Sequence, residues 1–329
     1  MSYDIIGDIH GHADQLIALL QKLGYQNRGG AWRHPSRSAI FVGDFVDRGP
    51  GQLRTLELVR AMTDAGSARA VMGNHEFNAI AWGTPDPMDD GTYLRPRHGA
   101  KGHKNRHQHQ AFLSEVGEDS ADHRHWIEWF MTLPLWIEEP GFRVVHACWS
   151  PSDVAALEPH LAAGARMTPE LVEAASRKGT AAYSAIETLL KGAEVELPAG
   201  HTFTDKDGHV RNAIRVKWWD PSLTNYRSAY IGPPGVVMPD VPIPAAETIP
   251  EPDRPTFIGH YWLDSNEAPE PRTRLVGCVD YSVARGGPLV AYRFDGEPEL
   301  TATNFIAAWP QPDAPRPTQT RLRAPPLGQ

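Results

Sequence analysis

Three short apolar segments in the first 76 residues each stop at a glycine followed by an aspartate or an asparagine. They are residues 3–6, 39–42 and 70–72, and they run into GDIHGH, GDFVDRGP and GNHE. Two later apolar segments, residues 143–145 and 256–258, end at His and at Gly-His. Turn formation alone does not require an amide, an imidazole and a carboxylate in succession. We interpret the five segments as buried strands whose ends carry functional groups.

The sequence between the first three strands has helical spacing. Apolar residues recur every three or four positions over residues 13–23 and again over residues 53–62. Strand-helix-strand alternation favours an α/β architecture, in which ligands bind beyond the carboxyl ends of the strands. The five polar strand ends are therefore predicted to converge on one site.

The residue types at these ends suit a metal site. Aspartate, histidine and asparagine are donors for Mn, Fe, Ni or Zn. Asp8 and His10 lie between glycines that permit a sharp turn, so both can reach one ion. A carboxylate such as that of Asp44 can bridge two ions, and two ions about 3.5–4 Å apart suit in-line displacement at phosphorus. Asn74 would then ligate through its amide oxygen, and His75 would face the substrate.

Together these motifs resemble the signature of the phosphoprotein phosphatase (PPP) family of calcineurin-like metallophosphoesterases. GDIHGH, GDFVDRGP and GNHE occur in the family order and at near-family spacing, followed by VHA and IGH. The family includes serine/threonine phosphatases, bacteriophage-type phosphatases and symmetrical diadenosine tetraphosphate hydrolases. The resemblance implies an α/β metallophosphoesterase four-layer sandwich, with two mixed β-sheets flanked by helices.

The resemblance also implies a dinuclear metal site and assigns its ligands. Both ions would share Asp44; the first would also bind Asp8 and His10, and the second Asn74, His146 and His260. Two divalent ions are expected, with manganese favoured over iron, zinc or nickel.

Three further residues receive catalytic roles from the resemblance. Arg48 would bind the phosphate through its planar guanidinium, which can donate two parallel hydrogen bonds. His75 would protonate the leaving oxygen as general acid, and Asp47 would orient it. The nucleophile would be a metal-bridging hydroxide, so no covalent enzyme intermediate is implied.

Two motifs depart from the family pattern. The fourth reads His146-Ala-Cys-Trp-Ser-Pro, where the family usually has His-Gly-Gly or His-Ala-Gly. In the last, tyrosine follows His260 where threonine is usual, and a competing GHT contains His201. We prefer His260, because an apolar strand precedes it and because residues 278–281, with an apolar strand at 289–292, resemble the closing hairpin of the family.

Two questions about single residues stay open at this stage. Oxidation or alkylation of Cys148, two residues after a predicted ligand, would disturb the second metal site, unless Cys148 is an inert buried thiol.

The family also has a second phosphate-binding arginine. Its candidates flank the segment WWDP: Arg211, Arg215 and Arg227.

We predict a single catalytic domain over residues 1–308, with insertions at about 77–125 and 151–255. In the second insertion, Thr168-Pro169 is typical of a helix start, with the helix running towards residue 190, and the proline-rich residues 232–255 indicate an extended excursion. The proline-rich tail, residues 309–329, is expected to be disordered.

The first insertion carries six histidines without a strong period: His98, His103, His107, His109, His123 and His125. A second metal site is one interpretation of them. Lysines and arginines in the same segment would repel a cation, so a solvated insertion is favoured. Those basic residues could instead form a rim that guides an anionic substrate.

Composition limits the remaining functions. A net charge of −8 argues against long nucleic acid as a partner. No apolar run approaches the roughly 20 residues of a membrane span, and two cysteines cannot form a disulfide framework. The first motif begins at Gly7, which leaves no room for a signal peptide before the fold, so we expect a cytoplasmic location. The sequence does not determine the oligomeric state.

The expected function is that of a metal-dependent phosphomonoester hydrolase. Its substrates would be phosphorylated proteins or peptides, with serine/threonine or tyrosine phosphatase-like activity, and small aryl phosphates. The alternatives are a symmetrical dinucleoside polyphosphate hydrolase, which acts on diadenosine tetraphosphate, and a non-catalytic module that senses phosphate or binds a partner.

Overall fold

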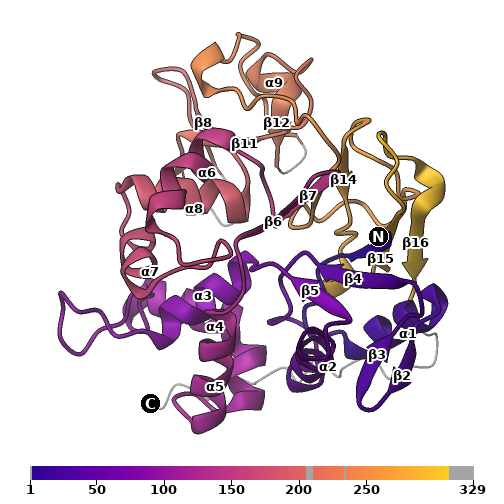
Figure 1. Cartoon of the computed structure of the whole chain (residues 1–329). Helices are drawn as coiled ribbons and strands as arrows, with labels where there is room; N and C mark the ends of the chain where they lie inside the picture. Colours follow the sequence, from indigo (N-terminus) through magenta and orange to yellow (C-terminus); the bar gives the residue numbers. More distant parts are fainter. Residues whose placement is uncertain (1, 205–209, 233–234, 311–329) are drawn as a thin grey trace, which may run out of the picture.

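Two mixed β-sheets form the centre of the fold in a computed structural model that describes residues 2–204, 210–232 and 235–310 (Figure 1). The five-stranded sheet has the order β16 (Phe305–Ala308), β15 (Leu289–Phe294), β1 (Ser2–Ile6), β4 (Arg37–Phe41) and β5 (Ala68–Ala70). The four-stranded sheet has the order β14 (Val276–Cys278), β13 (Thr256–Ile258), β7 (Phe142–Val145) and β6 (Trp136–Glu139).

Alternation of side chains along the strands gives each face of the five-stranded sheet its own core. Ile5 and Ile40 pair in register and belong to a fully buried cluster with Val144 and Phe257 of the other sheet. Ile6, the next residue, belongs instead to the cluster that contains the leucines of α1 (Ala13–Leu23) and the apolar side of α2 (Gln52–Asp64). The predicted arrangement of two mixed sheets flanked by helices is confirmed.

Strand direction explains why the polar strand ends meet. Strands β1, β4 and β5 are parallel neighbours, and β7 and β13 are parallel in the other sheet. Their carboxyl ends therefore point towards the same edge of the fold. The five predicted strands are all present, although β5 (Ala68–Ala70) lies two residues before its expected position at 70–72.

The first predicted insertion is helical, contrary to the expectation of an aperiodic segment. It contains most of α3 (Asn74–Gly83), all of α4 (Gly99–Val116) and the first half of α5 (Ala121–Phe130). The period is weak in the sequence because the large buried apolar residues of α4, Phe112, Leu113 and Val116, all lie in its last turns. The first half of that helix is polar and largely exposed.

The second predicted insertion combines helices with a small three-stranded sheet, and Figure 1 shows most of these elements gathered around α6 and α8. It comprises α6 (Pro151–Leu157), η1 (Glu158–His160), α7 (Pro169–Ser176), α8 (Ala181–Lys191), β8 (Glu194–Glu196), β9 (Phe203–Thr204), β10 (Val210–Arg211), β11 (Ala213–Val216), α9 (Tyr226–Ala229), β12 (Tyr230–Ile231) and η2 (Ala245–Glu247).

Two sequence predictions in the C-terminal half need correction. Thr168 does cap a helix, but that helix ends at Ser176, where Arg177 turns to an extended conformation with φ −100° and ψ 106°. Thr180 caps a second helix, after Gly179 with a φ of 96°. The expected closing hairpin is absent, since β14 and β15 lie in different sheets.

The remaining helices and strands of the described residues are short. They are the hairpin of β2 (Gln26–Arg28) and β3 (Ala31–Arg33), and the short helices η3 (Val283–Arg285) and η4 (Ala302–Asn304). Between residues 235 and 255 regular structure is limited to η2 and an isolated bridge, as expected for an extended excursion. Most of the predicted disordered tail, residues 311–329, lies outside the described residues.

Candidate metal centre

The loops after β4 and β5 approach closely because each contains a glycine at the contact. Gly43 has a φ of +99°, and a Cβ there would clash with the backbone of Gly73. A Cβ on Gly73 would clash with Asp44. Glycine at both positions therefore lets Asp44 and Asn74 come together.

Strained backbone conformations are concentrated in the same loops. Of nine non-glycine residues with positive φ among the described residues, six are close to the strand ends: His10, Asp44, Asp47, Arg48, His260 and Trp262. Left-handed conformations cost about 1–3 kcal/mol each in residues with a side chain, and they concentrate at functional sites. The fold therefore supports these loops at a cost in stability, which is typical of a site with a chemical role.

The Oδ2 atom of Asp44 lies at the centre of a group of imidazoles. It is 3.4 Å from Nε2 of His146, 3.7 Å from Nε2 of His10 and 3.9 Å from Nε2 of His75. Asp44 is buried and comes from the predicted bridging position. Its carboxylate therefore lies where one side chain can reach ligands of both expected ions.

Backbone carbonyls orient two of these imidazoles. Nδ1 of His10 lies 2.8 Å from the carbonyl oxygen of Val46, and Nδ1 of His146 lies 2.7 Å from that of Val42. A carbonyl can only accept, so each Nδ1 carries a proton and each Nε2 is the ring nitrogen that faces the cluster. Nε2 of His10 is buried and has no hydrogen-bond partner.

The second group of predicted ligands surrounds the amide of Asn74. Its Oδ1 lies 2.8 Å from Nδ1 of His260 and 3.2 Å from Nε2 of His146. Asp8 joins the two groups, because its Oδ2 accepts the backbone N–H of His260 at 3.0 Å. The other oxygen, Oδ1, is buried without a partner.

The donor set fits divalent metal ions. Burial lowers the pKa of His10 to about 3, with His75 adding to the effect, so His10 is neutral and able to ligate. Burial raises the pKa of Asp8 well above its ordinary value, and Asp280 raises it further. Unpartnered buried atoms on Asp8 and His10 are costly unless a cation compensates them. Ligand atoms of Asp44, His146 and His260 lie within 4.8 Å of one another, as do those of His10, Asp44 and His75.

The predicted catalytic residues lie beside this cluster. Nδ1 of His75 is 2.5 Å from Oδ2 of Asp47, and Nη2 of Arg48 is 3.5 Å from Nε2 of His75. Burial lowers the pKa of His75, but Asp44 and Asp47 raise it, and the net shift is upward. A raised pKa favours the protonated imidazole, which is the form that a general acid requires. Arg48 stacks on the ring of Trp262 at 4.0 Å, which holds the guanidinium near His75.

Glu76, the last residue of GNHE, received no role from the sequence, although the structure gives it one. Its carboxylate accepts the backbone N–H groups of Asp44 and Phe45, both at 2.8 Å, and of Gly73 at 3.0 Å. Glu76 is fully buried. It therefore ties the loop after β4 to the loop after β5.

We expect Glu76→Ala to lower the free energy of unfolding by at least about 2 kcal/mol, because several buried donors lose their acceptor. Denaturant unfolding followed by circular dichroism measures this loss. Glu57→Ala, on the exposed part of α2, is the matched control and should change stability by less than about 0.5 kcal/mol. Equal stability of both variants would show that Glu76 does not hold the loops.

The structure also separates the remaining sequence candidates. Arg215 lies at the cluster, with Nη1 3.3 Å from Nε2 of His260, whereas Arg227 is exposed and pairs with Asp240. Arg211 is exposed, as is His201. Of the three arginines, Arg215 is therefore the one placed to reach a bound phosphate.

Cys148 is fully buried, and burial raises the pKa of its thiol well above the ordinary value. The thiolate that alkylation needs is therefore scarce and inaccessible, and the structure favours an inert thiol over a reactive one.

The histidine-rich segment is not uniformly solvated, contrary to expectation. His98, His103, His107 and His125 are exposed, but His109 and His123 are buried. Among the described residues, neither belongs to a group of three or more metal-ligating side chains.

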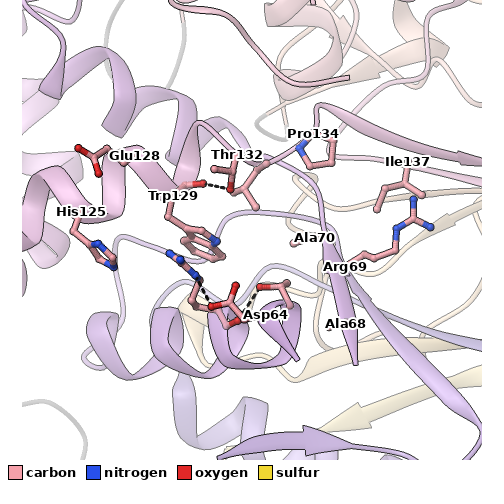
Figure 2. A pocket seen from close by; sticks show the side chains of 13 residues that line it. Asp64, Ala68, Arg69, Ala70, His125, Glu128, Trp129, Thr132, Pro134 and Ile137 are labelled. Atoms are coloured by element: carbon pink, nitrogen blue, oxygen red, sulfur yellow. Dashed lines mark hydrogen bonds and ion pairs between the residues drawn. The ribbon is translucent and has the colours of Figure 1, made fainter. Parts of the chain in front are cut away.

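A separate hollow of about 550 Å³ lies between α2, β5, α5 and β6 (Figure 2). Its lining includes Arg60, which stacks on Trp129, and Arg69, which pairs with Glu139 across the two sheet edges. None of the candidate metal ligands lines it, so we assign it no part in the chemistry.

The fold and the cluster define a metallophosphoesterase. Residues 1–156, just under half of the chain, match the family model described as calcineurin-like phosphoesterase. No helix in the described part of the chain has the length and apolarity needed to cross a bilayer.

Curated relatives match about a quarter of the chain. A bis(5'-nucleosyl)-tetraphosphatase PrpE [asymmetrical] of Halalkalibacterium halodurans is 47% identical over 76 residues, which is 23% of this chain and 31% of the relative. A symmetrical bis(5'-nucleosyl)-tetraphosphatase of Cronobacter sakazakii is 40% identical over 82 residues, 25% of each chain. The chain thus spans less than a third of the length of these relatives.

A solved structure of a protein serine/threonine phosphatase from Saccharomyces cerevisiae aligns over 95% of this chain and 82% of its own, with 16% identity and a TM-score of 0.45. A likeness at this level carries no argument about function.

Proposed function

We propose that the protein is a metal-dependent phosphomonoester hydrolase that acts on phosphorylated proteins or peptides and on small aryl phosphates. The observation that carries the proposal is the pairing of His75 with Asp47 at the edge of the candidate metal cluster. Alkoxide and phenoxide leaving groups are basic and need a proton, so a buried, oriented acid favours monoesters.

The candidate ligands would hold two divalent ions: Asp8, His10, Asp44, Asn74, His146 and His260. When bound, such ions supply charge stabilisation and a nucleophile at neutral pH, and manganese is our first choice. Arg48 binds the phosphoryl oxygens, and His75 transfers its Nε2 proton to the leaving oxygen. Asp47 holds Nδ1–H of His75 throughout, so the proton that leaves is the one on Nε2.

Arg215 is our choice for the second phosphate-binding arginine, because its guanidinium lies against His260. Arg215 comes from the second predicted insertion, and His109, from the first, contacts the carboxylate of Asp47 at 2.7 Å. We therefore propose that both insertions belong to a single catalytic domain that extends to residue 308. The cytoplasm remains the location that we propose.

A second candidate is hydrolysis of dinucleoside polyphosphates. Relatives that match about a quarter of the chain at 40–47% identity are named as tetraphosphatases, both symmetrical and asymmetrical. These matches cover only about a quarter of this chain. They therefore support shared chemistry more directly than a shared substrate.

We predict that chelation abolishes activity and that Mn²⁺ restores it, with para-nitrophenyl phosphate and a phosphoserine peptide cleaved faster than diadenosine tetraphosphate. Initial rates on the three substrates, offered in parallel to the reconstituted protein, test this. A higher kcat/KM for the dinucleotide would establish the second candidate, and its products would distinguish symmetrical from asymmetrical cleavage. Hydrolysis of none of them by protein with two bound ions would contradict both.

A further inference from the structure

His109 reaches the candidate catalytic residues from outside every motif. It lies on α4, and only 3% of its surface is exposed. Its Nδ1 is 2.7 Å from Oδ1 of Asp47, a residue 62 positions earlier in the chain. The first predicted insertion therefore contacts the catalytic loop directly.

The Asp47 carboxylate consequently has one imidazole at each oxygen. Oδ2 contacts Nδ1 of His75 at 2.5 Å, and Oδ1 contacts Nδ1 of His109 at 2.7 Å. Burial raises the pKa of Asp47, but His109 and His75 lower it, and the net shift is downward. Because an ionised carboxylate can only accept, both Nδ1 atoms carry protons and both contacts are hydrogen bonds.

The backbone of Asp47 does not by itself fix the carboxylate. Asp47 has a φ of +70° and Arg48 a φ of +76°, so the loop is strained here. The N–H of Asp47 donates to Oε1 of Gln52 at 2.6 Å, which holds the peptide but leaves the side chain free to rotate. Within the described residues, the hydrogen bonds to the carboxylate come from the two imidazoles, so His109 supplies the second point of attachment.

His109 is itself held rigidly. Its ring packs against Phe112 and Trp82, with centroid distances of 5.0 and 6.2 Å. Further along α4, Glu115 accepts the backbone N–H groups of Gln52 at 3.0 Å and Leu53 at 2.9 Å, at the start of α2. The helix that carries His109 is thus joined to the end of the catalytic loop.

We propose that His109 is a positioning residue for phosphoester hydrolysis. By donating to Oδ1 of Asp47 it fixes the plane of the carboxylate, which in turn keeps Nε2–H of His75 directed at the leaving oxygen. The inference rests on the proposed function, because it assigns His109 to the proton transfer made by His75.

Leaving-group dependence tests the inference. His109→Leu should lower kcat about 10–100-fold for phenyl phosphate, whose leaving group needs a proton, because outer partners of active groups typically contribute this much. For 2,4-dinitrophenyl phosphate, whose leaving group needs no acid, the loss should stay below about threefold. An equal loss on both substrates would mean that His109 has only a structural role.

Two matched variants sharpen the comparison. His109→Asn places an amide nitrogen near the position of Nδ1, so it should restore most of the rate on phenyl phosphate. His107→Leu changes an exposed histidine on the same helix and should have no effect.

In a His75→Asn background, His109→Leu should cause no further loss, since residues that act through one another are not additive. Additive losses, or no rescue by asparagine, would overturn the proposal.

A structural readout keeps the inference separate from the proposed function. In the ¹⁵N-histidine-labelled wild-type protein with metal bound, strongly hydrogen-bonded Nδ1 protons of His75 and His109 should both resonate far downfield. His109→Asn should remove one signal and retain the other. If the wild type hydrolyses no phosphoester, the proposed function fails while these signals still decide the contact. Absence of the His109 signal from folded protein would contradict it.

Discussion

Asp44→Asn should lower kcat for para-nitrophenyl phosphate by at least about 10³-fold, because charge stabilisation by bound metal is worth several kcal/mol and each 1.4 kcal/mol is tenfold in rate. Asp44 Oδ2 lies within 3.9 Å of three imidazole nitrogens, so one substitution weakens both halves of the cluster. The amide keeps the shape of the side chain but loses the charge and one ligand oxygen.

The metal content of the same variant separates ligation from folding. We expect it to bind fewer than two ions per chain by elemental analysis while it unfolds cooperatively like the wild type. Asp64→Asn, an exposed carboxylate at the end of α2, is the control and should keep both metal and activity. An Asp44→Asn protein with two ions and full activity would refute the bridging role.

His75→Ala should lower kcat for phenyl phosphate by about 10²–10⁴-fold, the range of general acid catalysis, and should leave metal content unchanged. The structure motivates this separation, because Nδ1 of His75 is 2.5 Å from Asp47, so that the ring is held by a residue that is not a predicted ligand. Steady-state kinetics and elemental analysis of one preparation measure both quantities.

The leaving group provides the internal control for His75. With 2,4-dinitrophenyl phosphate the defect should shrink, because that leaving group departs without a proton. If the variant loses its metal, His75 is a ligand, as its proximity to His10 and Asp44 would also permit. If it keeps full activity on phenyl phosphate, the acid is another residue.

Local sequence was sufficient to predict the parts of the site that follow strands. Asp8, Asp44 and Asn74 each come directly after an apolar segment, so their convergence depends only on strand direction. The two mixed sheets followed from the same alternation together with the family resemblance.

Contacts between distant helices could not be predicted in this way. His109 lies 62 residues from Asp47, on a helix whose polar half shows no period, and basic neighbours made a solvated segment the better interpretation. Arg215 was one of three candidates, because its approach to His260 depends on how the small sheet packs. Glu76 stood in the sequence motif, but its three backbone partners come from two different loops.

The most direct test of the account is a metal titration of chelator-treated protein, with hydrolysis of para-nitrophenyl phosphate as the readout. We predict that metal-free protein is inactive and that activity rises with Mn²⁺ until two ions are bound per chain. Full activity without metal, or a plateau with two bound ions and no hydrolysis of any phosphoester, would contradict the claim that these residues form a dinuclear phosphoesterase site.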